Sequence, residues 1–151
     1  MPVSANENYR YFVSMDSSGY SGTPLAKKLG IKEGFIISVL NQPEYYFQLF
    51  TDLPSDIKLV TNEKLKKNFI HYFVKEEKQL LKNIIKLKGQ IEQNGMIWIS
   101  WPKKAAKVAT DITEYVVRNI ALKNGLVDIK VCAVDDVWSG LKLVIPVKDR
   151  K

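Results

Sequence analysis

Residues 95–106, which read GMIWISWPKKAA, constrain the fold more strongly than any other stretch of this 151-residue sequence. The apolar run over 96–101 is too short for a surface helix, and its isoleucines and tryptophans favour a β-strand. Strands without alternating polar residues are typical of the middle of a parallel sheet, which is covered on both faces. Two lysines, Lys103 and Lys104, follow the run directly after a proline. The stretch therefore predicts an α/β fold with polar groups at the carboxyl edge of its sheet, where such folds bind ligands.

Five further segments have the composition of β-strands, and helical signals separate most of them. The full set of expected strands is 35–40, 57–60, 69–74, 96–101, 127–134 and 141–147. The clearest helix is expected over 76–88, because its leucines and isoleucines recur at helical spacing. Shorter helices are expected after Thr23 as an N-cap and over the aromatic segment 44–50. A last helix is expected after Asp111, where Glu114 would complete a capping box.

This order of elements predicts a mostly parallel sheet, because strands alternate with helices until a C-terminal hairpin adds one antiparallel strand. We therefore expect a three-layer, Rossmann-like α/β sandwich with six strands in the order 2-1-3-4-6-5, numbered along the chain, and with strand 6 antiparallel. The link over 61–68 is shorter than the roughly twelve residues that a parallel crossover usually takes. Residues 1–18 are expected to form an irregular N-terminal arm, and residues 19–151 a single Rossmann-like domain.

The composition excludes several classes of site and partner. A single cysteine, Cys132, excludes a disulfide within the chain, and together with a single histidine, His71, it argues against a zinc site. No apolar run approaches the ~18 residues that span a bilayer, and residues 2–20 lack the basic and apolar parts of a signal peptide. We therefore expect a cytoplasmic protein with no membrane partner and no metal.

The formal net charge of +7 favours an anionic partner, but the residues that supply it argue against nucleic acid. Only three of the basic residues are arginines, the side chain that makes bidentate contacts with bases and phosphates. Lys78, Lys82 and Lys86 share one face of the helix expected over 76–88, and either solvent or an anionic partner would have to cover that face. Nucleic-acid binding is therefore the weakest functional alternative.

The candidate ligand-binding residues are those that fall at the carboxyl edge of the predicted sheet. Lys103 and Lys104 precede a predicted helix and are candidates to hold a phosphate or a carboxylate, whereas the alternative is an ordinary solvated loop. Trp101 and Trp138 border polar turns and are candidates for a ligand pocket, although Trp138 could instead clasp the hairpin. The complete set of candidates is Asn41, Gln42, Ser100, Trp101, Lys103, Lys104, Trp138 and Ser139.

No catalytic residue can be identified from the sequence. Asp135 and Asp136 could act as an acid and a base, but two adjacent acids followed by Ser139 and Gly140 are more typical of a turn. His71 lies inside an expected strand and is interpreted as structural.

Three segments carry a resemblance that extends over nearly the whole chain after residue 18: GYSGTPLAKKLGI from Gly19, WISWPKK from Trp98 with TDITE from Thr110, and GLVDIKVCAVDDVWSGLKL from Gly125. Together they resemble a family of small bacterial proteins known only as a domain of unknown function. The predicted strand order resembles a trimmed class I methyltransferase fold that lacks one edge strand. This resemblance implies a Rossmann-like fold and makes S-adenosylmethionine a candidate cofactor, but it implies no established activity and no catalytic residues.

The positions that hold the cofactor in class I methyltransferases differ in this chain. Those enzymes place a glycine-rich turn after the first strand and an acidic residue after the second. Here residues 39–44 read VLNQPE without a glycine, and the nearest acid after the second strand is Glu63, later than expected. The signature for S-adenosylmethionine is therefore absent, which indicates that the fold is kept more faithfully than the activity.

We therefore expect a ligand-binding or interaction protein that resembles a degenerate methyltransferase, and we favour this over an enzyme. Its expected ligand is small and anionic or nucleotide-like. The alternative is a small S-adenosylmethionine-dependent methyltransferase. The alternating polarity of 127–134 indicates an exposed edge strand, which leaves pairing into a homodimer open.

Overall fold

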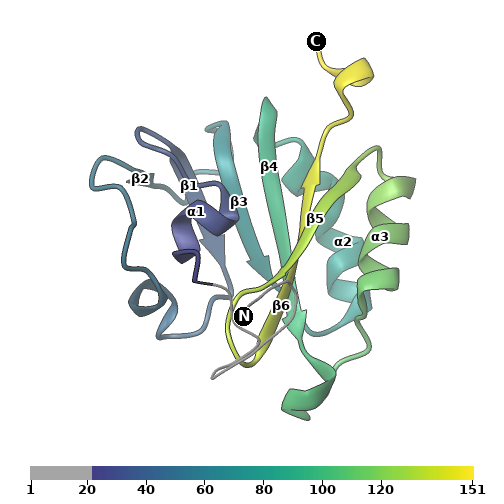
Figure 1. Ribbon diagram of the computed structural model, residues 1–151. Coiled ribbons are helices and arrows are strands. Elements are labelled where there is room, and N and C mark those ends of the chain that lie inside the picture. Colours follow the sequence, from purple (N-terminus) through teal and green to yellow (C-terminus); the bar gives the residue numbers. More distant parts are fainter. Residues whose placement is uncertain (1–21) are drawn as a thin grey trace.

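The computed structural model describes residues 22–151, and the arm expected over 1–18 lies outside this range. Six strands form one sheet in the order β2-β1-β3-β4-β6-β5 (Figure 1). Only β6 runs antiparallel to its neighbours β4 and β5. The predicted Rossmann-like strand order is thereby confirmed, including the antiparallel strand 6. The strands are β1 (Ile36–Leu40), β2 (Lys58–Leu59), β3 (Lys67–Phe73), β4 (Ile91–Pro102), β5 (Val127–Ala133) and β6 (Trp138–Val144).

Helical elements cover both faces of the sheet and complete three layers (Figure 1). The face that packs against α2 and α3 is called the α2 face below, and the opposite face, which packs against α1 and η2, is called the α1 face. The helices are α1 (Leu25–Leu29), α2 (Glu77–Lys88) and α3 (Glu114–Lys123), and the 3₁₀ turns are η2 (Tyr46–Leu49), η3 (Lys104–Ala106) and η4 (Val147–Asp149).

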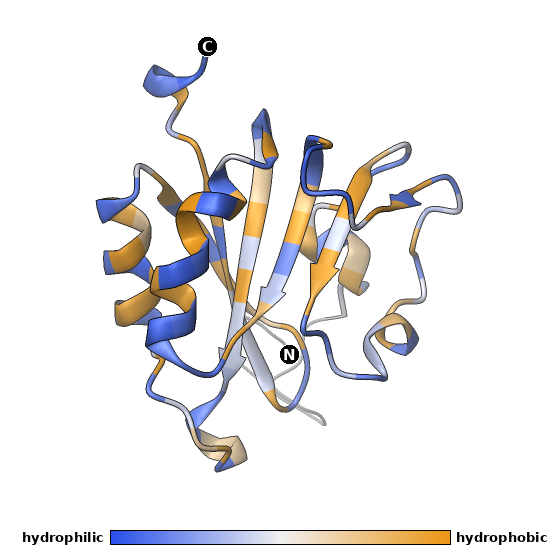
Figure 2. Ribbon diagram, turned by 180° about the vertical axis from the view of Figure 1, so that it is seen from behind, coloured by the Kyte–Doolittle hydropathy of each residue, from blue (hydrophilic) through white to orange (hydrophobic). Residues whose placement is uncertain are grey.

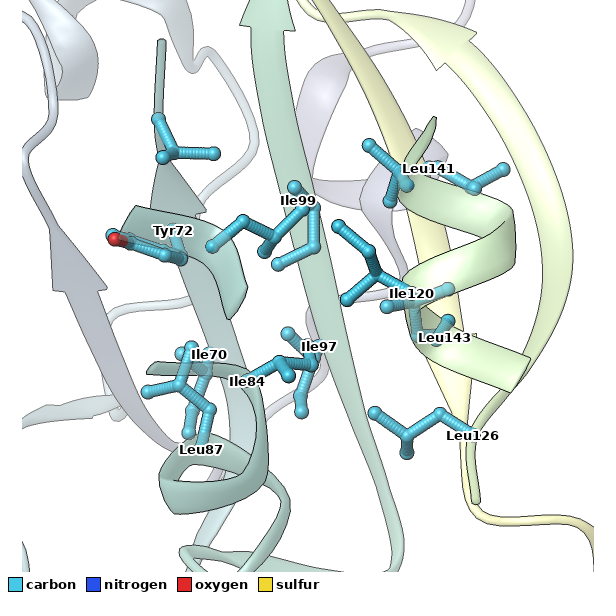
Figure 3. Close-up of a cluster of buried hydrophobic side chains, with 14 of the residues drawn as sticks. Ile70, Tyr72, Ile84, Leu87, Ile97, Ile99, Ile120, Leu126, Leu141 and Leu143 are labelled. Atoms are coloured by element: carbon cyan, nitrogen blue, oxygen red, sulfur yellow. The ribbon is translucent and has the colours of Figure 1, made fainter. Parts of the chain in front are cut away.

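Side-chain alternation along β4 divides the core between the two faces. Ile97, Ile99 and Trp101 pack into the cluster beneath α2 and α3, part of which Figure 3 shows. Met96 and Trp98 point the other way, into the cluster that contains α1. The part of β4 over 96–102 is therefore almost entirely apolar, because both of its faces are covered there. In the helices, by contrast, Figure 2 shows polar and apolar residues alternating along α2 and α3, as expected of helices with one buried side.

The bounds of several elements differ from the sequence prediction. β6 is Trp138–Val144 rather than 141–147, because the turn before it is short and Trp138 already pairs with Pro102, and β3 is Lys67–Phe73 rather than 69–74. β4 begins at Ile91, five residues before the predicted run, because Lys67 pairs with Ile91 ahead of an irregularity near Gly95. Residues 92–94 are polar and interrupt the apolar run, so the sequence did not indicate that the strand begins at Ile91. β2 has only two residues, and the helix predicted over 44–50 is a four-residue 3₁₀ turn.

The cap predicted for α1 is wrong. Its N-cap is Pro24 rather than Thr23, and no cap side chain at that position accepts a hydrogen bond. Instead the carboxylate of Asp52 accepts from the amides of Ala26 and Lys27, at 3.0 Å each. A residue far along the chain thus satisfies the exposed amides of this helix.

The capping box predicted at Asp111 and Glu114 is also wrong. Thr113 caps α3, and its side chain accepts a hydrogen bond from the amide of Val116. Asp111 instead accepts from the amide of Glu77 at 2.7 Å, which caps the first turn of α2. Asp111, which the sequence pattern assigns to the start of α3, therefore stabilises the start of α2.

The link between β2 and β3 crosses the sheet without a helix. Residues 60–66 contain neither helix nor strand, yet β1 pairs in parallel with both β2 and β3. The short link is therefore long enough to return the chain, as the sequence allowed. A crossover of this kind usually carries a helix that covers the strand beneath it. Here the α2 face of β1 lacks that cover, and this absence shapes the site described next.

Candidate ligand-binding cleft

Two adjoining cavities open where the strand order reverses, between β1 and β3. This switch point at the carboxyl ends of parallel strands is where open α/β folds bind ligands. The edge cavity, of about 380 Å³, is lined by Asn41, Tyr72, Phe73, Val74, Lys75, Glu76, Gln79 and Trp138. The face groove, of about 290 Å³, is lined by Ser38, Leu40, Asn41, Thr61, Glu63, Tyr72, Gln79, Asn83, Lys86, Leu87 and Gln90. Asn41, Tyr72 and Gln79 belong to both cavities and therefore mark their junction.

Asn41 occupies the turn that follows β1 and has an unusual backbone conformation. Its φ of 58° lies in the left-handed region, which asparagine tolerates better than most residues other than glycine. The sequence after β1 contains no glycine, so Asn41 supplies the sharp change of direction there. Asn41 belongs to the lining of both cavities.

Trp138 forms the aromatic wall of the edge cavity. Its ring meets the edge of Phe73 at a centroid distance of 5.0 Å and an interplanar angle of 89°. The hairpin loop holds it in place, because Oδ1 of Asp135 accepts from the amides of Val137 and Trp138 at 2.8 Å each. Trp138 is thus held by the hairpin turn and also lines the cavity. The two roles that the sequence suggested for it, a contact that fixes the hairpin and a wall of a pocket, are compatible.

Asp135 is engaged in the turn and in a contact with Tyr45. The Tyr45 hydroxyl donates to Oδ2 of Asp135 at 2.7 Å. Burial and this hydrogen bond raise the pKa of Tyr45 to about 12, so its hydroxyl stays protonated at neutral pH. With both carboxylate oxygens occupied, the geometry favours the turn interpretation of Asp135.

Ser100 lies in a buried polar network on the α1 face and lines neither cavity. Nε2 of His71 is 2.7 Å from the Ser100 hydroxyl, and Nδ1 is 2.9 Å from the Tyr46 hydroxyl. His71 is also stacked on Phe73 with ring centroids 4.3 Å apart. Burial lowers the pKa of His71 to about 3, so the imidazole is neutral and can donate through only one ring nitrogen. The network therefore suits packing rather than proton transfer to a ligand.

Of the eight predicted site residues, only Asn41 and Trp138 line one of the two cavities. The other six lie elsewhere. Trp101 is buried beneath α2 and α3, and Ser139 pairs with it on β6. Gln42 and Lys104 are exposed outside the two linings. Lys103 is half-buried; burial lowers the pKa of its ammonium, while the charges of Asp136 and Asp135 raise it. The predicted ligand-binding roles of these residues stay predictions.

Sequence reasoning missed most of the groove-lining residues. Gln79, Asn83 and Lys86 recur every three or four residues along α2, which places them on one side of the helix. A polar stripe of this kind is normally attributed to solvent. Only its position opposite Thr61 and Glu63 shows that it faces a cavity.

The edge cavity combines aromatic and amide groups with one cation, Lys75, and one anion, Glu76. Within residues 22–151, no group of three or more histidine, cysteine, aspartate or glutamate side chains is placed to hold a metal ion. No helix in the same range is long and apolar enough to cross a membrane.

The sheet order and the cavity at its switch point define a Rossmann-like α/β protein with a methyltransferase-like fold. The chain belongs to the family described as "Protein of unknown function (DUF3052)", whose model matches residues 26–147. A comparison with curated protein sequences finds no match.

Solved structures with a similar fold include several methyltransferases. The ribosomal protein L11 methylase from Lactobacillus delbrueckii subsp. bulgaricus has a TM-score of 0.52 and 11% identity, over 80% of this chain and 74% of that one. The magnesium protoporphyrin IX methyltransferase from Synechocystis PCC 6803, with bound SAH, has a TM-score of 0.55 and 10% identity, over 76% and 75% of the two chains. An O-methyltransferase from neocarzinostatin biosynthesis, with S-adenosylmethionine, has a TM-score of 0.54 and 7% identity, over 72% and 48%. At these identities the likeness shows the fold alone.

Proposed function

We propose that this protein binds a small organic molecule with a planar ring, such as a nucleoside or nucleotide, in the edge cavity. The observation that carries the proposal is the position of Trp138 and Asn41 in one cavity at the switch point between β1 and β3. Ligand pockets typically combine aromatic walls with a few polar groups that fix orientation. The edge cavity has this composition, and its volume of about 380 Å³ lies in the usual range of ~300–1,000 Å³.

The charges at the edge cavity favour a ligand that carries polar or ionic groups beside its ring. Lys75 and Glu76 are adjacent and exposed, and both line the cavity. An ammonium group there attracts a phosphate or carboxylate, and a carboxylate accepts from hydroxyl or amino groups. Asn41 and Gln79 add amide groups that both donate and accept. Such a set suits a nucleotide-like or zwitterionic ligand.

A second candidate is an S-adenosylmethionine-dependent methyltransferase, and two observations favour it. Asn41 adopts the left-handed conformation that a glycine would provide in the turn after β1. Glu63, although later than expected after β2, lies in the lining of the adjoining face groove. Two of the similar structures contain SAH or S-adenosylmethionine, which makes these compounds the first probes.

The test is a calorimetric and thermal-shift titration with S-adenosylmethionine, S-adenosylhomocysteine, adenosine, ATP and NAD. A ligand present at ~100 times its dissociation constant stabilises the folded state by ~2.7 kcal/mol, so a shift of several degrees is expected for the ligand that fits. Gln79→Ala should weaken the interaction about threefold to tenfold, the worth of one hydrogen bond. Gln48→Ala is the matched control, because Gln48 is exposed and lines neither cavity.

The outcomes separate the two candidates. Binding of adenosine or ATP that Gln79→Ala weakens supports the binding function. Selective binding of the S-adenosyl compounds, followed by methyl transfer to an acceptor, supports the enzyme. Absence of binding by every probe contradicts a nucleoside-like ligand in the edge cavity.

A further inference from the structure

The face groove is a second site, beyond the one used by the proposed function. It lies on the α2 face of the sheet rather than at its edge, between α2 and the link over 60–66. From Gln79 to Leu87 its helical wall extends about 12 Å, at ~1.5 Å per residue. The groove exists because the link carries no helix that could cover β1.

A buried hydroxyl group lies on the floor of the groove. Ser38 is only 5% exposed and lines the groove, and within residues 22–151 its hydroxyl forms no hydrogen bond. A buried polar group left unsatisfied costs free energy, so native structures rarely keep one without a reason. Ser38 therefore offers a donor and an acceptor to whatever occupies the groove.

A second hydroxyl on the floor is oriented by its neighbour. The side-chain amide of Asn83 donates to the Tyr72 hydroxyl at 2.9 Å. The Tyr72 oxygen thus serves as an acceptor within the protein, and its own proton is left to donate outward. Figure 3 shows this oxygen on the side of the ring that points away from Ile97 and Ile99. The floor therefore presents two hydroxyl groups toward one space, from adjacent strands.

The charge of the groove is balanced. Glu63 on the link side and Lys86 on α2 have opposite charges, and the other polar groups in the lining are amides and hydroxyls. An anionic ligand would meet Glu63, and a cationic ligand would meet Lys86. Amides and hydroxyls each donate and accept, which is also what the hydroxyl groups of a ligand do.

We propose that the face groove binds an uncharged polyhydroxyl group, such as a sugar or cyclitol ring, with Ser38 and Tyr72 on its floor and Thr61 and Asn83 on its walls. A volume of about 290 Å³ is close to the lower end of ligand pockets, ~300 Å³, so the group is a single small ring. The site does not depend on the ligand of the edge cavity.

The test is an amide NMR titration of the isotope-labelled protein with D-ribose, D-glucose and myo-inositol at millimolar concentrations, and with inorganic phosphate as the charged probe. We expect saturable shifts at the amides of Ser38, Thr61 and Asn83 with at least one neutral probe. Ser38→Ala should weaken this binding about threefold to tenfold. The variant should fold normally, because it removes a buried hydroxyl that forms no hydrogen bond in the described part of the chain. Ser55→Ala is the matched control, since Ser55 is exposed and lies outside the groove.

The result separates this site from the edge cavity, which neither Ser38 nor Thr61 lines. If Ser38→Ala no longer binds the polyol but still binds a nucleoside, the result supports two distinct sites. If the protein binds the polyol but no nucleoside, the result supports the face groove alone. The proposal is overturned if no neutral probe shifts these amides, if the shifts persist unchanged in Ser38→Ala, or if phosphate alone produces them.

Discussion

The ammonium nitrogen of Lys67 lies 2.7 Å from the carbonyl oxygen of Asn62. The same nitrogen donates to Oε1 of Gln90 at 3.0 Å. Lys67 is only 1% exposed, and burial lowers the pKa of its ammonium while the charge of Glu63 raises it. Lys67, at the start of β3, thus connects the link over 60–66 to Gln90, which follows the C-cap of α2. It joins the two walls of the face groove.

Lys67→Met should loosen the link without unfolding the sheet. The substitution leaves the Asn62 carbonyl and the Gln90 amide without this donor, a cost of ~1–3 kcal/mol, partly offset by removal of a desolvated ammonium. We expect a net loss of about 1 kcal/mol in urea denaturation and faster amide exchange over 60–66. Lys64→Met, at an exposed position, is the control. Unchanged exchange in the link would contradict a clamping role for Lys67.

The buried imidazole of His71 should make stability depend on pH. The unfolded chain takes up a proton below about pH 6.5, whereas the folded chain keeps His71 neutral down to a pKa of about 3. This contribution is therefore fully present above about pH 6.5 and is lost as the pH falls, by up to ~1.4 kcal/mol per pH unit. His71→Gln should be less stable at neutral pH but should lose that slope. Equal slopes for both proteins in urea denaturation between about pH 5 and 6.5 would refute the assignment.

Asp111→Ala should destabilise the start of α2 rather than α3. The substitution removes the acceptor of the Glu77 amide, and loss of a helix cap costs about 1 kcal/mol. Hydrogen exchange should accelerate in the first turn of α2, while Thr113→Ala should accelerate it in α3. Asp149→Ala, at an exposed position, is the control for loss of an acid. If Asp111→Ala accelerated exchange in α3 alone, the result would contradict this assignment and would support the capping box that the sequence predicts.

Gly140→Ala should overpack the α1 face. A Cβ at this position would lie 3.0 Å from Cε3 of Trp98 and 3.2 Å from the Ser100 hydroxyl. Because both neighbours are fully buried, they have little room to move, and a cost of about 1–3 kcal/mol is expected. Gly22→Ala, where a Cβ would meet no atom within 4 Å, should be neutral. Thermal denaturation of the two variants measures the difference, and equal midpoints would show that the core adapts.

The strand order was predictable because it depends on local patterns and on general rules of chain connection. The apolar run over 96–101 marks a central strand, and the C-terminal hairpin marks the antiparallel one. The caps were not predictable in the same way. Asp52 and Asp111 reach helices that lie far from them in sequence, and no local pattern contains that contact.

The sequence indicated which residues fall at the carboxyl edge of the sheet, but not which side chains line the cavities, and the predicted ligand-binding roles stay predictions. Asn41 and Trp138 lie where the carboxyl-edge rule places them. Ser100 is adjacent in sequence to that edge, but the alternation along β4 turns its side chain into the α1 face, where His71 binds it. Gln79 and Asn83 resemble solvent-exposed helix positions until Thr61 and Glu63 are placed opposite them.

The sequence by itself determined the class of fold, the strand order and the edge of the sheet at which polar groups gather, because these follow from periodicity and connectivity. Only the tertiary structure decided which polar groups share a space. That outcome depends on the short link over 60–66, which crosses the sheet without a helix. It leaves the Ser38 hydroxyl buried beside α2 with no hydrogen bond to any residue over 22–151. Contacts between segments distant in sequence arise from packing, and packing is not encoded in any one segment.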